Sequence, residues 1–228
     1  MSIIIKSQTI YGAPSIVTDG LSLYLDAANT RSYPGSGTAW YDLSGNVNHG
    51  TLVNGPTFDS GNAGSIVFDG TNKYVNFPNP LNQTQLDQIW TVQSWINITT
   101  APYQILVGGL NSDLFIEYVQ GNNSLLYLNG SPNDYYTYGG QFTSQGWVLA
   151  TFRFNNSTGD RQILRNNTNI STTGPNQTST PSGQLSTFTL SSSNNAINGK
   201  VANLFIYDRY LSDEEILQNY NVIKNRYS

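Results

Sequence analysis

Acidic side chains are the groups of this 228-residue chain that could do hydrolytic chemistry, and only three of them are glutamates. Hydrolysis of a glycosidic bond needs two carboxyl groups across the scissile bond, one as proton donor and one as nucleophile or base. Glu214 and Glu215 stand where a helix is predicted to begin, and Glu117 has no Asp or Glu within three residues. The sequence therefore predicts no catalytic residues, with an aspartate pair from different strands as the alternative.

The only histidine, His49 in NVNHG, restricts two other kinds of site. One histidine cannot build a histidine metal cluster. We favour a structural role for it over a place in a Ser-His-Asp triad. The chain has no cysteine, which removes disulfides, thiolate nucleophiles and cysteine metal sites.

Oxygen-bearing side chains alternate at Asp42, Ser44 and Asn46 in the segment DLSGN, as ligands do in a calcium-binding loop. The Gly and the closing bidentate Glu of an EF-hand are out of place. The alternative is an Asx turn, in which Asp42 accepts hydrogen bonds from backbone N–H groups and Gly45 takes a positive φ. Asp69, in FDG, has the same two interpretations. These residues are the metal candidates, and calcium is the cofactor they would bind.

Three tyrosines, Tyr135, Tyr136 and Tyr138, crowd the Gly-rich segment NDYYTYGG. Exposed aromatic rings beside amide groups can bind sugars, and tyrosine is also enriched at protein interfaces. A third interpretation is a loop that folds back over a sheet. We rank the interface and the folded-back loop above the glycan site.

Short strand patterns recur along the chain between clusters of Gly, Pro, Asn and Ser. Many short strands with frequent turns predict a β-sandwich or barrel. Along one of them Val92, Ser94 and Ile96 share a face, which leaves Trp95 on the other. We read residues 166–182 as an exposed polar loop. The predicted strands are Leu21–Leu25, Ser65–Phe68, Tyr74–Phe77, Thr91–Ile98, Gln104–Val107, Leu114–Val119, Ser124–Leu128, Val148–Phe154, Gln162–Arg165, Phe188–Leu190 and Val201–Tyr207.

The C-terminal segment predicts a strand followed by a capped helix. The run Leu204–Tyr207 is rich in aromatic and branched residues, as a strand buried on both faces requires. Ser212 with Glu215 three residues later is a capping box. A stripe at helical spacing then follows, which predicts a helix packed on the sheet. Its members are Ile216, Leu217, Tyr220 and Ile223.

The composition excludes two classes of partner. Only 10 residues are Lys or Arg and the net charge is −4. No basic patch can therefore form to neutralise the phosphates of a nucleic acid or to bind a membrane surface. We therefore expect neither nucleic acid nor membrane as a partner. Charged residues make up only 11% of the chain, so its surface must interact through neutral hydrogen bonds and aromatic faces.

Four segments in register carry a resemblance to a known family: GLSLYLDAAN (20–29), AWYDLSGNVNHGTL (39–52), IVFDGTNKYV (66–75) and IYDRYLSDEEI (206–216). With Trp95 and Trp147 as strand tryptophans, the chain resembles the laminin-G-like jelly-roll domains of the concanavalin A-like lectin/glucanase superfamily. The resemblance implies an all-β antiparallel sandwich with a short C-terminal α-helix. It covers residues 19–228 as one domain and leaves residues 1–18 as an N-terminal arm.

The resemblance also bears on chemistry. Glucanases of the superfamily carry an E-x-D-x-x-E or E-x-D-x-E pattern on one strand, and this chain lacks it. Laminin-G-like relatives often bind calcium through Asp and carbonyl oxygens. Where they often carry an acidic pair in the final strand, this chain has Ala202 and Asn203, which weakens a calcium site carried over from them.

The fuller segment TDGLSLYLDAANTRSYPGSGTAWYDLSGN resembles the form found in structural proteins of tailed bacteriophages. It implies a non-enzymatic virion protein, assembled in the host cytoplasm, such as a capsid decoration protein or a head or tail fibre component. The implied partners are the major capsid protein or other virion proteins, further copies of the chain, and a polysaccharide. A lectin, with or without calcium, is the alternative, and a glycoside hydrolase is disfavoured.

The arm is a candidate for docking to a virion partner. Ile3, Ile4 and Ile5 form a run with strong β preference that could add a strand to an exposed sheet edge. The alternative is a first strand that completes the chain's own sandwich.

Overall fold

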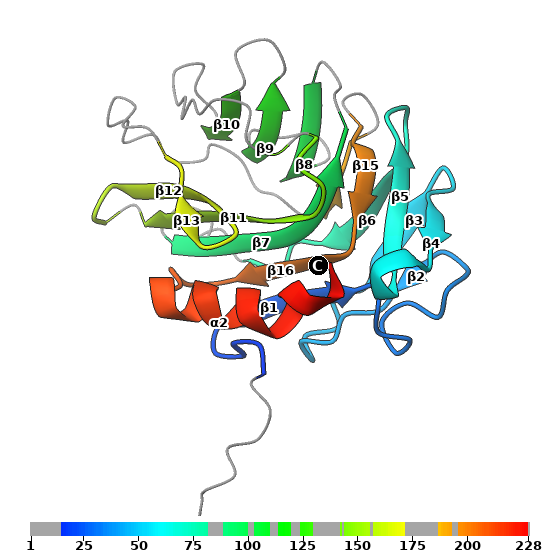
Figure 1. The fold of residues 1–228 in the computed structure, drawn as a ribbon, viewed down its shortest axis with the longest axis horizontal. Coiled ribbons are helices and arrows are strands. Elements are labelled where there is room, and N and C mark those ends of the chain that lie inside the picture. The colour runs from blue at the N-terminus through cyan, green and yellow to red at the C-terminus, as the bar shows by residue number, and fades with distance from the viewer. Residues whose placement is uncertain are drawn as a thin grey trace, which may run out of the picture.

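Two antiparallel β-sheets pack face to face, and one helix lies on the outer face of the larger sheet (Figure 1). The structure is a computed structural model. It describes residues 15–81, 89–99, 103–109, 114–119, 124–129, 142, 144–155, 157–171, 187–192 and 196–227. The arrangement confirms the predicted all-β sandwich with a short C-terminal helix. No helix among the described residues has the length and apolar character needed to cross a membrane.

The larger sheet has nine strands in the described part of the chain. Its long strand β7 pairs along one edge with β15 and then with β16, and β1 pairs with β16 to form the edge of the sheet there. The order is β13 (Thr168–Asn169), β12 (Asp160–Arg165), β11 (Val148–Asn155), β7 (Ile89–Ile98), β15 (Asn198–Val201), β5 (Ser65–Asp69) and β4 (Thr57–Asp59), with β16 (Asn203–Tyr207) also beside β7 and β1 (Leu21–Asp26) beside β16.

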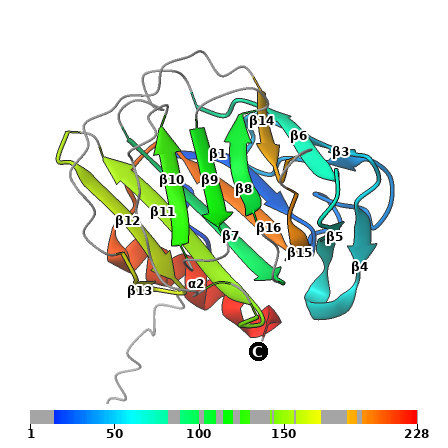
Figure 2. The same ribbon diagram turned by 90° about the horizontal axis from the view of Figure 1, so that it is seen from above.

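The smaller sheet has seven strands among the described residues and lies across the larger one (Figure 2). Its order is β10 (Ser124–Asn129), β9 (Leu114–Val119), β8 (Tyr103–Gly109), β14 (Thr187–Leu190), β6 (Tyr74–Pro78), β3 (Gly50–Val53) and β2 (Ala39–Trp40). Two short 3-10 turns, η1 (Gly61–Ala63) and η2 (Lys224–Arg226), complete the described elements.

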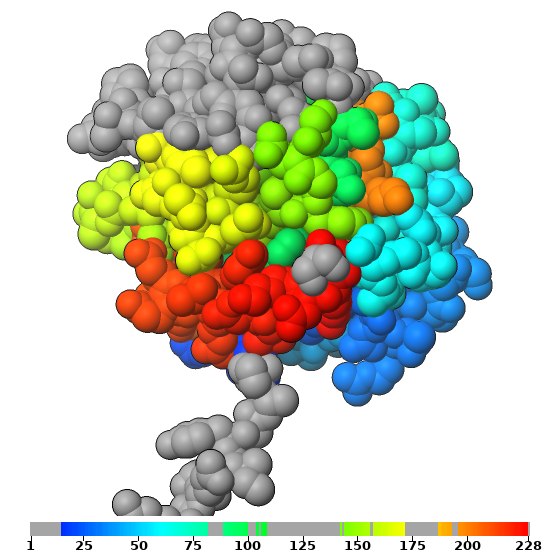
Figure 3. Space-filling model, in the orientation of Figure 1, coloured from blue at the N-terminus to red at the C-terminus, as the bar shows by residue number. Residues whose placement is uncertain are grey.

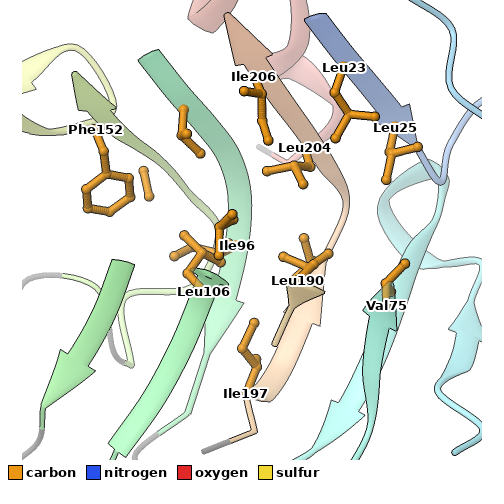
Figure 4. Packing of buried hydrophobic residues seen from close by; sticks show 14 of the residues in the cluster. Leu23, Leu25, Val75, Ile96, Leu106, Phe152, Leu190, Ile197, Leu204 and Ile206 are labelled. Atoms are coloured by element: carbon orange, nitrogen blue, oxygen red, sulfur yellow. The ribbon is translucent and has the colours of Figure 1, made fainter. Parts of the chain in front are cut away.

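The main core fills the space between the sheets. Leu204 and Ile206 of β16 meet Leu190 of β14 and Val75 of β6 across this space (Figure 4). All four side chains are fully buried. A second apolar cluster lies on the other face of β16, where Phe205 and other residues contact the helix. Burial on both faces of β16 confirms the prediction made from its apolar run.

The predicted strands are all present, with one error at the C-terminal one. The predicted strand Val201–Tyr207 is two strands, because the strand pairing is interrupted at Ala202. Its N–H donates to the Trp95 carbonyl at 2.9 Å, and its carbonyl accepts from the Ala27 N–H at 2.9 Å. The pattern also missed β2, β3, β4 and β13, which have two to four residues each.

The predicted exposed loop at residues 166–182 is wrong over its first part. Residues 166–171 form a hairpin whose strand β13 pairs with β12, and Ile170 is buried at 6% exposure. Asn166 makes the turn with a φ of 59°. Apolar burial of one side chain therefore pins a segment that its polar composition describes as a loop. Residues 172–182 lie outside the described residues.

The helix α2 (Asp213–Ile223) begins as the sequence predicts. The Glu215 N–H donates to Ser212 Oγ at 3.3 Å and the Ser212 N–H donates to Glu215 Oε2 at 2.9 Å, which completes the capping box. One residue of the predicted stripe is wrong, because Leu217 is 39% exposed. Asn219 takes the buried position instead, and its side chain enters a polar network under the helix.

Candidate functional site

The carboxylate of Asp42 is the centre of the densest set of hydrogen bonds near β1. Oδ1 accepts from the backbone N–H groups of Tyr24 and Ser44, both at 2.9 Å. Oδ2 accepts from Ser44 Oγ at 2.8 Å and from the Asn48 N–H at 3.0 Å. The Leu43 N–H then donates to the Tyr24 carbonyl at 2.8 Å. The backbone N–H and carbonyl of Tyr24, in β1, are thereby paired with a loop rather than with a strand.

Side-chain amides extend this pairing along β1. Asn46 Nδ2 donates to the Leu21 carbonyl at 3.0 Å and to the Ser22 carbonyl at 3.2 Å. Asn48 Nδ2 donates to the Ser22 carbonyl at 3.0 Å. Because β1 pairs with β16 on its other side, residues 42–48 occupy the position of a missing neighbour strand. We call residues 42–48 the β1 edge cap. An open strand edge is a template for association, and this segment covers it.

The calcium candidates in this segment therefore have other partners. Asp42 is 8% exposed, and four donors occupy its two oxygens. Ser44 Oγ and the Asn46 amide donate to Asp42 or to β1 carbonyls. In the described residues no three His, Cys, Asp or Glu side chains gather where they could hold a metal ion. The arrangement is the Asx turn of the two interpretations, and these residues do not fit a calcium site.

Asp69 lies at the end of β5 and serves a separate turn. Its Oδ1 accepts from Thr71 Oγ1 at 2.6 Å and from the Thr71 N–H at 3.2 Å, and its Oδ2 pairs with Lys73 Nζ at 3.0 Å. The Thr71 hydroxyl and then Lys73 lower the pKa of Asp69 to about 2. Asp69 and Asp42 thus have separate sets of partners.

His49 follows the edge cap and has a fixed tautomer. Its Nδ1 accepts the Asp42 N–H at 3.0 Å, so this nitrogen carries no hydrogen and Nε2 carries one. The ring lies edge-on to Tyr41, with centroids 5.2 Å apart and planes at 81°. These contacts fit the structural role expected for this histidine. The exposed Tyr41 beside it is a residue that the sequence did not single out, since a tyrosine in a turn gives no signal of its exposure.

Two other acidic side chains, Asp26 and Asp213, form ion pairs at the two ends of the C-terminal helical segment. Asp26 is fully buried, and both of its oxygens accept from Arg226 Nη1, at 3.0 and 2.9 Å. Tyr24 Oη also donates to Asp26. Burial of the Tyr24 hydroxyl, and to a lesser extent the negative charge of Asp26, raises the Tyr24 pKa. Arg153, with a side chain 5% exposed, pairs with Asp213 at the start of α2. These contacts fasten both ends of the helical segment to the sheet.

The N-terminal residues that the structure describes lie under α2. The Val17 N–H donates to Asn219 Oδ1 at 2.8 Å, and Tyr207 Oη donates to the Val17 carbonyl at 3.0 Å. Gln218 Nε2 donates to the Ser15 carbonyl at 2.7 Å. Residues 15–18 of the predicted arm therefore contact the domain's own helix. The docking candidates Ile3, Ile4 and Ile5 lie outside the described residues.

A buried polar network joins these residues to the sheet. Asn219 Nδ2 donates to Gln93 Oε1 at 2.6 Å and to Tyr207 Oη at 2.9 Å, and Gln93 Nε2 donates to Thr151 Oγ1 at 3.0 Å. The four side chains are at most 1% exposed. A polar residue in an apolar stripe is usually a surface residue, so the sequence concealed this role of Asn219.

Two groups of candidates remain without a structural account. The tyrosines Tyr135, Tyr136 and Tyr138 lie outside the described residues. Glu117 lies in β9, but its side chain is likewise not described.

Residues 69–217 match the model of a protein family described as the concanavalin A-like lectin/glucanases superfamily. This match covers more than half of the chain. The chain belongs to this family. The superfamily resemblance is therefore confirmed, and no curated protein matches the chain.

Solved structures of the same fold include enzymes and binding domains. The Trypanosoma rangeli sialidase in complex with 2,3-difluorosialic acid has a TM-score of 0.65 and 15% identity, over 96% of this chain and 35% of that chain. The binding domain of botulinum neurotoxin DC in complex with SialylT has a TM-score of 0.64 and 14% identity, over 90% and 52%. The same domain in complex with rat synaptotagmin II gives 0.66 and 14%, over 91% and 52%. The chain spans about a third to a half of these solved chains, and the likeness concerns the fold alone.

Proposed function

We propose that this protein is a non-catalytic carbohydrate-binding module and that it is carried on a virion. The family hosts lectins and hydrolases on one fold, so membership alone does not choose between them. The observation that carries the proposal is how hydrogen bonds and ion pairs hold the acidic side chains in the described part of the chain.

A glycosidase needs a carboxyl group whose pKa is raised, so that it can donate a proton near neutral pH. The shifts at Asp59, Asp69 and Glu215 run the other way. Lys200 lowers the pKa of Asp59, the Thr71 hydroxyl that of Asp69, and Arg209 that of Glu215. Carboxylates held in this way stabilise turns, strands and the helix cap, and this supports binding without catalysis.

Two observations favour carbohydrate as the ligand. The surface has few charges, and 12% of the chain is aromatic, so neutral hydrogen bonds and ring faces are the contacts it can offer. A binding domain with the same fold is known in complex with SialylT. Sugar recognition combines an apolar platform with a few placed polar groups.

The virion setting rests on the bacteriophage-like form of residues 18–46 and on how the N-terminal residues are held. Ser15 and Val17 are hydrogen-bonded to α2, which fixes the place where the N-terminal arm joins the domain. In this proposal the run Ile3–Ile5 adds a strand to a virion partner, such as the major capsid protein.

A glycan array and a reducing-end assay test the module directly. We expect retention on a subset of glycans and no release of reducing ends from β-glucans, agars, alginates or bacterial capsular polysaccharides. Turnover that Glu117→Gln abolishes would overturn the non-catalytic proposal. Absence of binding to every glycan would overturn the carbohydrate part.

Deletion of residues 2–13 tests the virion part, because it spares the segment that contacts α2. We expect an unchanged melting temperature and loss of binding to phage capsids at a defined stoichiometry. Failure of the full chain to bind capsids would refute the virion setting. A sharp fall in melting temperature would instead identify the segment as part of the chain's own sandwich.

A further inference from the structure

Two of the three exposed large apolar side chains in the described part of the chain lie on one loop. The three are Tyr41 at 44%, Val47 at 66% and Leu217 at 39% exposure. The first two flank or belong to the β1 edge cap, between β2 and β3, while Leu217 lies alone on α2 beside the acidic Asp213 and Glu214. Two exposed apolar residues on one short loop mark it as the candidate binding surface of the described part of the chain.

The loop is held rigidly before any ligand arrives. The Tyr41 N–H donates to the Ser32 carbonyl at 2.7 Å, and the Tyr41 carbonyl accepts from Ser32 Oγ at 2.6 Å. Asp42, the next residue, is fixed by its four hydrogen bonds. Val47 is held at a φ of 63°, a conformation that a β-branched side chain adopts only when its surroundings impose it. A preorganised platform loses little conformational freedom on binding.

Hydrogen-bonding groups of defined direction lie on the same loop. His49 is exposed, and its Nε2 carries the ring hydrogen because Nδ1 accepts from Asp42. Asn46 and Asn48 turn their Nδ2 groups to β1 carbonyls, while their Oδ1 atoms accept no hydrogen bond from the described residues. The loop therefore offers one donor on the ring beside Tyr41 and two acceptors elsewhere along residues 46–48, which suits hydroxyl groups that both donate and accept.

The charge of the loop selects among sugars. Residues 41–49 contain no Lys or Arg, and their one carboxylate, Asp42, is 8% exposed with its oxygens occupied. An acidic sugar would bring a carboxylate to a surface with no cation to receive it, at a cost in desolvation. A neutral sugar meets no such cost.

We propose that Tyr41 and His49 form a calcium-independent binding site for a neutral hexopyranose residue of a glycan. The Tyr41 ring stacks on the C–H face of the sugar, and His49 Nε2–H and the Asn46 and Asn48 Oδ1 atoms bind its hydroxyls. The site deepens the proposed carbohydrate-binding function and rests on it. It shares Asn46 with the calcium candidates, but the carboxylates of Asp42 and Asp69 take no part in it, because their oxygens already accept hydrogen bonds within the chain.

Binding measurements on ring variants test this site. Neutral and sialylated glycan arrays, each with and without EDTA, are probed first with the wild-type chain. The best neutral ligand is then titrated against Tyr41→Ala, Tyr41→Phe and the matched control Leu217→Ala, which removes a side chain of similar exposure on α2. Melting temperatures verify that each variant is folded.

We expect binding of neutral glycans that EDTA leaves unchanged, and a loss of affinity of about tenfold in Tyr41→Ala. Tyr41→Phe keeps the ring and should stay within about threefold, and Leu217→Ala should equal the wild type. Equal affinity of Tyr41→Ala and the wild type would overturn the site while leaving the carbohydrate-binding function in place. Dependence on calcium, or a strict requirement for sialic acid, would also overturn it. Failure of the wild type to bind any glycan would refute the underlying function itself.

Discussion

Two regions complete the same part of the larger sheet by different physical means. The helix α2 covers the outer face of β16 and β1 with an apolar cluster, in which Leu211, Ile216 and Ile223 are at most 1% exposed. In Figure 3 the helical segment, in red, forms part of the molecular surface. The β1 edge cap closes the edge of β1 with side-chain hydrogen bonds to its backbone. The face is covered by burial, whereas the edge is covered by polar groups.

The difference explains where the exposed apolar groups lie. A cover that depends on burial must turn its apolar residues inward, and α2 leaves only Leu217 outside. A cover that depends on hydrogen bonds can leave its apolar side chains free, and the loop exposes Tyr41 and Val47. The edge cap is therefore the region where a binding surface can develop without loss of the fold.

Removal of the helix is expected to have the largest effect. Ending the chain after Tyr210 would expose Trp95, Phe205 and Tyr207, which are at most 2% exposed in the full chain. We expect aggregation, because a contiguous apolar face of this kind is not tolerated in water. Size-exclusion chromatography and thermal melting provide the measurement. A soluble truncated chain with an unchanged melting temperature would show that α2 is an appendage.

Asn219→Leu tests the polar network beneath the helix. The change leaves the buried Val17 N–H and the buried side-chain oxygen Gln93 Oε1 without this partner, so we expect a loss of about 3 kcal/mol in the free energy of unfolding. Asn221→Ala, on the exposed side of the same helix, should change it by less than about 0.5 kcal/mol. Urea denaturation measures both. Equal effects of the two substitutions would mean that burial alone holds the helix.

Asp42→Asn tests the edge cap in the same way. The amide cannot accept on both atoms, so the Ser44 and Asn48 donors lose a partner, and we expect a loss of about 2 kcal/mol. Concentration-dependent self-association should accompany it as the β1 edge opens. Asp69→Asn, an exposed turn carboxylate, should cost less than about 1 kcal/mol and cause no association. Equal behaviour of the two variants would remove the special role of Asp42.

The smallest expected effect is a pH dependence of stability that arises at the helix cap. Arg209 holds the pKa of Glu215 below its usual value, so the ionised form is favoured in the folded state. The stabilisation that ionised Glu215 gives the fold is present above its pKa in the unfolded chain, about 4.3. It is lost as the pH falls through the pKa of Glu215 in the folded chain. We expect the urea midpoint to fall from pH 5 to pH 3, and to fall less in Glu215→Gln. Parallel curves for the two proteins would contradict the assignment.

The sequence predicted the helix more fully than the edge cap, for a local reason. The capping box and the positions of Ile216 and Ile223 lie within one element, where spacing decides the contacts. Asp42 combines local partners, Ser44 and Asn48, with Tyr24 on β1, which lies 18 residues earlier in the chain, so the residue types alone left a calcium loop and a turn both open. The exposure of Tyr41 and the buried role of Asn219 likewise depend on the tertiary fold.

Strand prediction shows the same limit. Long strands such as β7 and β11 have clear patterns, while β2 and β13 have two residues each and form only because neighbours offer backbone partners. Ala202 separates β15 from β16 through bonds to Trp95 and Ala27, which no local pattern records.

Amide hydrogen exchange at Tyr24 tests most directly whether the edge cap replaces a strand. The Tyr24 N–H donates to Asp42 Oδ1, while the N–H of Leu25 points to the other edge of β1, toward β16. We expect both amides to exchange slowly in the wild type. In Asp42→Ala the Tyr24 amide should exchange fast while Leu25 remains slow. Fast exchange of Tyr24 in the wild type, or slow exchange of Tyr24 in Asp42→Ala, would contradict the edge cap.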